Sequence, residues 1–242
     1  MLTASESFAA VEIDVTARYN EAGALYRDGQ FDRSLSIYEE LIGEGISNPD
    51  LYYNASNAAY RTGSPGKSIL YLERALKLAP SDKEALANLA YLNSIKKDQE
   101  IDNSNVVIVF LARRYNAVNV NSAAVWSGTA FAIAMAFLTA TLFVRKWKRV
   151  TFAVAASLLG LVFIVSTGIF FQKVHHNSTV IEGIIMSEEA PAYSGPGVEN
   201  THIFTIHEGT KVVIERSQDF WNLIRLNSGA GGWIKDELME EI

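Results

Sequence analysis

Two long apolar stretches constrain this chain more than any other feature. Residues 123–144 and 150–171 each run for 22 positions without an Asp, Glu, Lys, Arg or His side chain. At about 1.5 Å per residue, a helix of that length reaches roughly 33 Å and can cross a hydrocarbon core of about 30 Å. Two buried helices of a soluble core are the alternative, but such helices normally keep a polar face. The sequence therefore predicts a transmembrane helical hairpin over 122–172.

The five residues between these stretches predict the orientation of the hairpin. Four of them are cations, namely Arg145, Lys146, Lys148 and Arg149. Positive residues in short loops stay on the cytoplasmic side of a membrane. We therefore expect both large flanking regions to lie outside the cytoplasm.

The first residues do not have the pattern of a signal peptide. Residues 1–20 contain neither a basic start nor a long apolar segment. Either a signal has been lost from this chain, or translocation of the first hundred residues depends on the first span. We favour the lost signal.

The region before the apolar stretches contains an internal repeat. The segment 25–42 recurs as 59–76 at an offset of 34 residues, so that Gly29 matches Gly63 and Ser34 matches Ser68. The period, the glycine between two helices and the small residues at the packing contact resemble the tetratricopeptide repeat. In this chain serine replaces the alanine that is usual for that family at positions 34 and 68.

This resemblance implies an α-helical solenoid over residues 1–97. It would contain two repeats, 15–48 and 49–82, and a capping helix that starts near residue 82. Such helix pairs cannot bury their apolar faces alone, so neighbouring repeats must stack on one another. The open end of this short stack, near 83–110, is expected to need a cover, either from the segment 105–115 or from another protein.

The first helix of each repeat is expected to line a concave groove. Residues spaced by four, seven and eight positions share one helix face, and Gly23 falls on that face in the first repeat. Aromatic faces offer contact area and guanidinium groups bind carboxylates in pairs, so the set suits an extended peptide. Any single tyrosine could equally be ordinary packing between helices. The candidate groove residues are Tyr19, Tyr26, Arg27, Tyr53, Asn57, Tyr60, Arg61 and Tyr91.

A polar and then apolar linker occupies residues 98–121. An amphipathic interfacial helix that feeds the first span fits its composition, and so does a cap docked on the repeats. The sequence does not choose between them.

Short β-rich runs separated by turns follow residue 176. The order of a Ser-Gly-Pro turn at 194–196, a His-Glu-Gly-Thr hairpin at 207–210, a strand at 221–226 and a Gly-Gly-Trp-Ile strand at 231–234 resembles the bacterial SH3-like domain. This resemblance covers 178–242 and implies a small β-barrel.

The same resemblance implies a peptide-binding surface on that barrel, and in some members the peptide comes from the cell wall. The candidates here are Tyr193, Trp221 and Trp233. The two tryptophans could instead fill the interior of so small a domain. Tyr193, beside a proline and a glycine, is the better candidate for an exposed contact.

Composition and motifs argue against several chemistries. A net charge of -6 gives no reason to expect nucleic acid as a partner, and the lack of cysteine excludes disulfides and thiolate sites. The Gly-Lys-Ser at 66–68 looks like a nucleotide loop, but Arg61 stands where that loop needs glycine and Pro65 removes a donor. We find no catalytic motif, no metal ligand set and no cofactor site, and we expect a non-enzyme.

The order of the parts resembles the BatE family of the bacterial aerotolerance operon across nearly the whole chain. The segments 24–42, 51–80 and 203–234 carry this resemblance. It implies an α + β multidomain membrane protein in which a tetratricopeptide solenoid, two transmembrane helices and an SH3-like β-barrel follow one another. Both soluble domains would be periplasmic and anchored in the bacterial inner membrane.

The family also implies a function and partners. Such proteins are encoded beside a MoxR-type ATPase and membrane proteins with von Willebrand A domains. The expected role is an interaction scaffold in an envelope complex tied to oxidative or aerotolerance stress. The alternative is a sensor that binds cell-wall peptide through the SH3-like domain.

Overall fold

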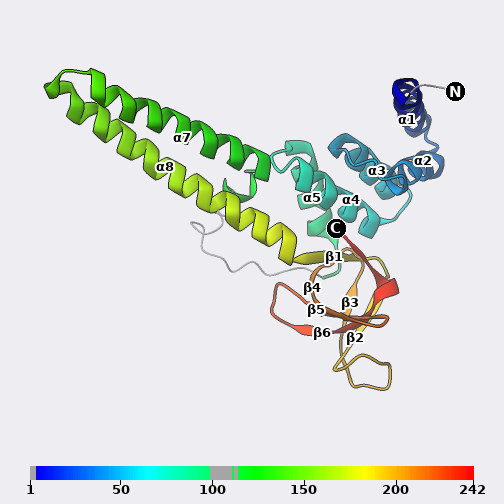
Figure 1. Cartoon of the computed structure of the whole chain (residues 1–242). Helices are drawn as coiled ribbons and strands as arrows, with labels where there is room; N and C mark the ends of the chain where they lie inside the picture. Colours follow the sequence, from blue (N-terminus) through cyan, green and yellow to red (C-terminus); the bar gives the residue numbers. More distant parts are fainter. Residues whose placement is uncertain (1–3, 99–110, 112–113) are drawn as a thin grey trace. The chain divides into compact units, whose positions relative to one another are not determined.

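The computed structural model describes residues 4–98, 111 and 114–242, and the side chains of 4–13, 177 and 178 are not described. The chain forms two compact units. One unit joins Met1–Asn103 with Ile181–Ile242, and the other is the intervening Ser104–Val180. Figure 1 labels the elements of both. Most of the linker predicted over 98–121, with its two alternatives, lies outside the described residues.

Five consecutive helices form the first part of the chain, as the repeat predicts. Gly29 and Gly63 connect the two helices of each pair with φ angles of 79° and 81°, a left-handed conformation that glycine adopts without steric cost. The helices are α1 (Ala4–Arg27), α2 (Phe31–Gly43), α3 (Pro49–Arg61), α4 (Pro65–Leu78) and α5 (Lys83–Ile95).

The serines that replace alanine are buried and hydrogen-bonded within their helix pairs. Ser34 Oγ on α2 donates to the carbonyl oxygen of Ala22 on α1 at 2.8 Å. In the second pair, Ser68 on α4 bonds the hydroxyl of Ser56 on α3 at 2.9 Å. Residues 22 and 56 are themselves related by the 34-residue offset. Each serine therefore meets the same position of its partner helix, and among the described residues no buried side-chain nitrogen or oxygen atom lacks a hydrogen-bond partner.

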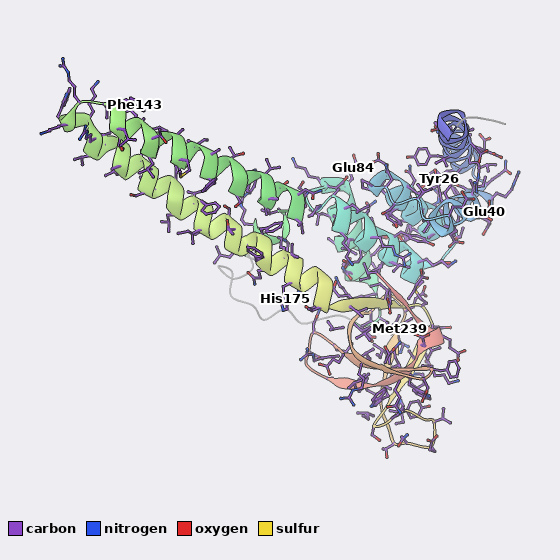
Figure 2. All side chains as sticks on the ribbon, viewed as in Figure 1. Tyr26, Glu40, Glu84, Phe143, His175 and Met239 are labelled. Atoms are coloured by element: carbon purple, nitrogen blue, oxygen red, sulfur yellow. The ribbon has the colours of Figure 1, made fainter. Side chains whose placement is uncertain are left out.

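The two apolar stretches form a pair of long helices, α7 (Val120–Phe143) and α8 (Lys146–Thr179). Both are long and apolar enough to cross a membrane, and only 17% and 6% of their most apolar windows are buried. Figure 2 shows side chains projecting outward from both helices. Ser127 and Thr167 bond each other at 2.6 Å across the pair, which satisfies two hydroxyls inside an apolar surface.

The connection between these helices is shorter than the sequence predicts. Because α8 begins at Lys146, the cations Lys146, Lys148 and Arg149 belong to its first turns, and Arg145 is the N-cap residue. All four remain at the end of the helix pair, next to the exposed Phe143 that Figure 2 labels.

The last part of the chain is a seven-stranded antiparallel sheet. Its strand order is β3-β2-β6-β5-β4-β1-β7. Its core includes Ile185, Ile206, Ile224 and Ile234. The strands are β1 (Ile181–Ile185), β2 (Glu189–Tyr193), β3 (His202–His207), β4 (Lys211–Gln218), β5 (Trp221–Arg225), β6 (Gly231–Lys235) and β7 (Met239–Glu241), with a short 3-10 helix η1 (Asp236–Leu238) before β7.

The closed barrel expected from the SH3-like resemblance is wrong. Strands β3 and β7 are the two edges of the sheet, and the described residues show no pairing between them. Strand β7 pairs with β1 alone, over three positions. On its other side, the carbonyl oxygen of Glu241 accepts a hydrogen bond from Arg74 of α4. A backbone acceptor at this edge is thus satisfied by the helical repeats rather than by a closing strand.

Candidate functional site

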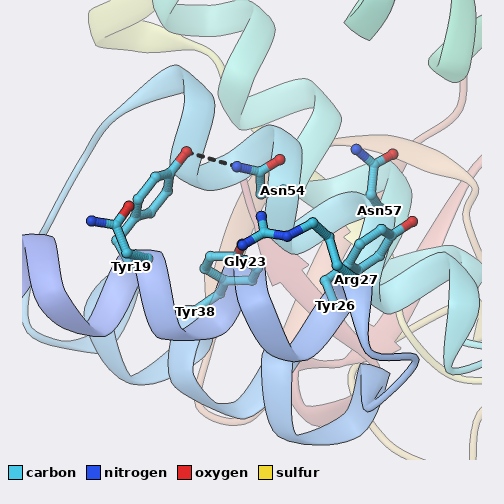
Figure 3. Close-up of a pocket in the computed structure, with 8 residues that line it drawn as sticks. Tyr19, Gly23, Tyr26, Arg27, Tyr38, Asn54 and Asn57 are labelled. Atoms are coloured by element: carbon cyan, nitrogen blue, oxygen red, sulfur yellow. Dashed lines mark hydrogen bonds between the residues drawn. The ribbon is translucent and has the colours of Figure 1, made fainter.

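The helices α1 and α3 line a hollow of about 400 Å³, to which Tyr38 of α2 also contributes. Figure 3 shows the α1 side chains facing Asn54 and Asn57 of α3 across it. Four of the predicted residues are brought together here, namely Tyr19, Tyr26, Arg27 and Asn57. The prediction missed Asn20, Tyr38 and Asn54, which complete the lining together with Gly23.

At one position that lines the hollow, the first repeat has glycine where the second has asparagine. Gly23 corresponds to Asn57 at the 34-residue offset. A Cβ atom placed on Gly23 would lie 3.5 Å from Nη1 of Arg27 and 3.6 Å from the hydroxyl of Tyr38, which is ordinary van der Waals contact. Because Gly23 has no side chain, space is left beside it, and the side chains of Arg27 and Tyr38 border this space.

The two arginines predicted for the groove lie in different surroundings. Arg61 on α3 places its guanidinium carbon 4.0 Å from the ring centroid of Phe31, a cation–π contact that holds it beside α2. Arg27 lines the hollow, and among the described residues it forms no ion pair. The structure therefore does not bring Arg61 to the hollow and leaves Arg27 as its cation.

The predicted tyrosines Tyr19 and Tyr53 each accept a hydrogen bond from the next repeat. Asn54 Nδ2 donates to the hydroxyl of Tyr19 at 2.7 Å, and Asn88 Nδ2 donates to the hydroxyl of Tyr53 at 3.3 Å. Both pairs span 35 residues, so the same bond recurs once per repeat. Tyr53 also donates to Glu84 at 3.2 Å. These tyrosines thus join neighbouring repeats through their hydroxyl groups.

The remaining tyrosines lie further along the same side. Tyr60 on α3 and Tyr91 on α5 pack edge to face at 6.1 Å, and their hydroxyls bond at 3.2 Å.

Tyr38 reaches the base of the hollow from α2 and is buried. Burial raises the pKa of Tyr38 to about 12, so it stays a neutral hydroxyl at physiological pH.

A second group of aromatic side chains lies together on the C-terminal sheet. Tyr193 packs edge to face on Trp221 at 5.6 Å between centroids and on His202 at 6.0 Å. Trp233 is paired with Tyr193 across β2 and β6 and is buried, although it is not part of the sheet core. The three predicted residues are thus brought together, with Tyr193 and Trp221 half-buried and His202 exposed. We call Tyr193, His202, Trp221 and Trp233 the aromatic cluster.

The described residues contain no group of three or more His, Asp or Glu side chains that could hold a metal ion. The polar groups of the hollow are amides, hydroxyls and one guanidinium, which recognise backbone and carboxylate groups rather than perform bond-breaking chemistry. The site is therefore suited to binding.

Comparison with known families identifies the helical region. Residues 19–83 match the family model of the tetratricopeptide repeat. The match begins at Tyr19, inside α1, and ends at Lys83, so it covers the last part of α1, the whole of α2, α3 and α4, and all the residues of the hollow. Tetratricopeptide repeats are a non-catalytic fold that binds other proteins, which gives this part of the chain a role in protein–protein interaction. No curated protein matches the chain.

Proposed function

We propose that this chain is a membrane-anchored, non-enzymatic scaffold that holds a protein partner in the groove of its tetratricopeptide repeats. The observation that carries this proposal is the hollow that α1 and α3 line, with an arginine that has no acidic partner among the described residues. Its amides can bond an extended backbone, and Arg27 can take a carboxylate in a bidentate pair. The partner segment is therefore an extended peptide with an acidic group.

The membrane anchor in this proposal is the α7–α8 pair, with its basic end on the cytoplasmic side. The repeats and the sheet would then both be periplasmic in a bacterial inner membrane. The resemblance to BatE makes the partners other membrane proteins of one envelope complex, including proteins with von Willebrand A domains and a MoxR-type ATPase system. It also connects the complex with oxidative or aerotolerance stress.

Co-purification of the full chain from native membranes tests the groove. Arg27→Ala is expected to reduce the amount of captured partner strongly, because it removes the cation of the hollow. Arg33→Ala is the matched control, since Arg33 is an exposed cation of α2 whose side chain bonds Gln30 and does not line the hollow. Equal capture by both variants and the unmodified chain would remove the groove from the proposal.

The aromatic cluster supports a second candidate function, the binding of cell-wall peptide. Its edge-to-face rings gather at one side of the sheet, where Tyr193 and Trp221 are partly accessible. Aromatic faces of this kind provide contact area at low entropic cost.

Sedimentation of the detergent-solubilised chain with purified cell-wall sacculi tests this second function. Trp221→Ala should abolish a saturable interaction. Phe220→Ala is the control, because this neighbouring aromatic is 82% exposed and makes no ring contact with the aromatic cluster in the described structure. An absence of saturable binding by the unmodified chain would exclude the sensor role.

A further inference from the structure

The side of α4 that faces away from α3 is covered by the C-terminal sheet of the same chain. Residues 66, 69, 70, 73 and 77 share this side by helical spacing. The backbone N–H of Gly66 donates to Oε1 of Glu208, in the β3–β4 turn, at 2.7 Å. Ile184 of β1 is fully buried in the same apolar cluster as Leu70. The repeats and the sheet thus share one core.

Ion pairs surround this contact. Lys211 of β4 lies between Glu73 of α4 at 3.1 Å and Glu182 of β1 at 2.9 Å. Burial alone lowers the pKa of Lys211, but the two carboxylates outweigh it and raise that pKa, so the ammonium stays charged. Arg74 of α4 also bonds Glu240 of β7 at 3.0 Å.

The end of the helical repeats provides a further contact. Asp98, three residues after α5, accepts from the backbone N–H of His207 at 2.7 Å and from the hydroxyl of Thr210 at 2.9 Å. Its other oxygen lies 2.8 Å from Nδ1 of His207. The β3–β4 turn is therefore held between the start of α4 and the end of the repeats.

The first repeat shows what this side looks like without a cover. At the 34-residue offset, Gly66 and Leu70 of α4 correspond to Asp32 and Ser36 of α2. Asp32 and Ser36 are exposed, whereas Gly66 and Leu70 are buried. Polar residues thus occupy the open side of repeat one, and a glycine and a leucine occupy the covered side of repeat two. The second repeat thus has residues suited to burial where the equivalent residues of the first repeat are suited to solvent. This difference indicates that the contact between α4 and the sheet is permanent.

We propose that this side of α4 is a docking site for the chain's own C-terminal sheet, and that the docked pair is one folded body whose sequence is interrupted by the segment 104–180. The chain leaves this body after Asn103 and returns to it at Ile181. Because the contact requires repeats and sheet in one compartment, any membrane insertion of 104–180 must cross an even number of times. This constraint is independent of the charges at residues 145–149.

A disulfide introduced into the full chain in its membrane tests the docking. The chain has no cysteine, so an engineered pair has no competitor. A Cβ atom on Gly66 would lie 2.7 Å from Cγ of Glu208, which is close to where a cysteine sulfur at 208 would stand. Gly66→Cys with Glu208→Cys should therefore oxidise to an intramolecular disulfide, which migrates as a compact monomer on a non-reducing gel.

The equivalent position of the first repeat supplies the control. Asp32→Cys with Glu208→Cys should stay reduced under the same conditions, because the sheet does not cover that side of α2. Equal oxidation of both pairs, no oxidation of the 66–208 pair, or disulfide-linked dimers instead of monomers would each overturn the proposal.

A second pair of variants keeps the test decisive if a cysteine at residue 66 perturbs the helix. Leu70→Asp places a charge under the sheet and should expose the C-terminal sheet to limited proteolysis. Ser36→Asp, the same change at the equivalent exposed position, should leave its protection unchanged. Unaltered protection in a folded Leu70→Asp protein would contradict the docking site.

Discussion

Gly23 lines the hollow, and we expect its replacement by alanine and by leucine to affect partner capture differently. Glycine inside a helix costs stability relative to alanine, and a Cβ atom here makes only ordinary contacts with Arg27 and Tyr38. We predict that Gly23→Ala raises the free energy of unfolding by about 0.5–1 kcal/mol without loss of partner capture. Gly23→Leu should fill the hollow and abolish capture. Denaturant unfolding and co-purification measure the two effects, and a destabilised Gly23→Ala protein would show that the site is tighter than the structure indicates.

Asp98 makes the contact with the sheet sensitive to acid. Burial raises the pKa of this carboxyl, but hydrogen bonds from the side chain and backbone of His207 and from Thr210 outweigh it, so the pKa is lowered in the folded state. A lowered pKa stabilises the fold fully above the unfolded value of about 3.9, and this contribution is lost as the pH falls below it. We predict that Asp98→Asn loses this part of the acid dependence, which begins as the pH falls below about 4. Thermal unfolding of both proteins above and below that pH measures it, and parallel curves would contradict the assignment.

For single residues, the sequence predicts those that share a helix face by regular spacing. It does not predict contacts between residues that lie far apart in the sequence. Tyr19, Tyr26 and Arg27 follow from helical spacing, and the hollow contains all three. Glu208 was only part of a hairpin motif, because its partner Gly66 lies 142 positions away. No local pattern encodes a contact of that separation.

Among the elements, α4 begins without a side-chain cap of its own. Its N-cap residue Ser64 makes no capping hydrogen bond, whereas Asn48 and Asp82 cap α3 and α5. Glu208 supplies the missing acceptor from the sheet, and its negative charge also suits the positive end of the helix dipole.

We predict that Glu208→Ala lowers the free energy of unfolding by about 1 kcal/mol. Glu208→Gln should lower it by less, because the amide oxygen can still accept the hydrogen bond from the backbone N–H of Gly66. Denaturant unfolding of the full chain in detergent is the measurement. Glu189→Ala, at an exposed position of β2, is the control and should be neutral. A loss in the control equal to that at residue 208 would assign the effect to charge rather than to capping.

Sequence patterns predict five of the seven strands of the C-terminal sheet. The structure forms β1, β3, β4, β5 and β6 in five β-rich runs of the sequence, because alternation and β-branched residues mark them. These runs are 179–187, 201–207, 210–217, 220–226 and 231–235. Strands β2 and β7 were missed, since a proline interrupts the first and acidic side chains dominate the second. Both are stabilised by pairing with other strands, which a local pattern does not contain.

For the molecule as a whole, two independent features bear on its topology. Docking of the sheet on α4 requires that the repeats and the sheet share a compartment. The proposed orientation, with the cations at 145–149 on the cytoplasmic side, would make that compartment the periplasm. The order of domains was readable from composition and repeats, but their docking was not, because it depends on how side chains far apart in the sequence fit together.

Cysteine labelling in intact spheroplasts separates these two features. Single variants Ser36→Cys in the repeats and Ser228→Cys in the sheet both carry exposed side chains, as does Trp147→Cys beside the cations. We predict that a membrane-impermeant maleimide labels residues 36 and 228 at once and residue 147 only after the membrane is permeabilised. If the reagent labels residue 147 alone in intact spheroplasts, the orientation is the reverse of the proposed one, but the docking is not contradicted. Labelling of residue 36 without 228, or the reverse, would place the two domains on opposite sides, and no contact between α4 and the sheet could then exist.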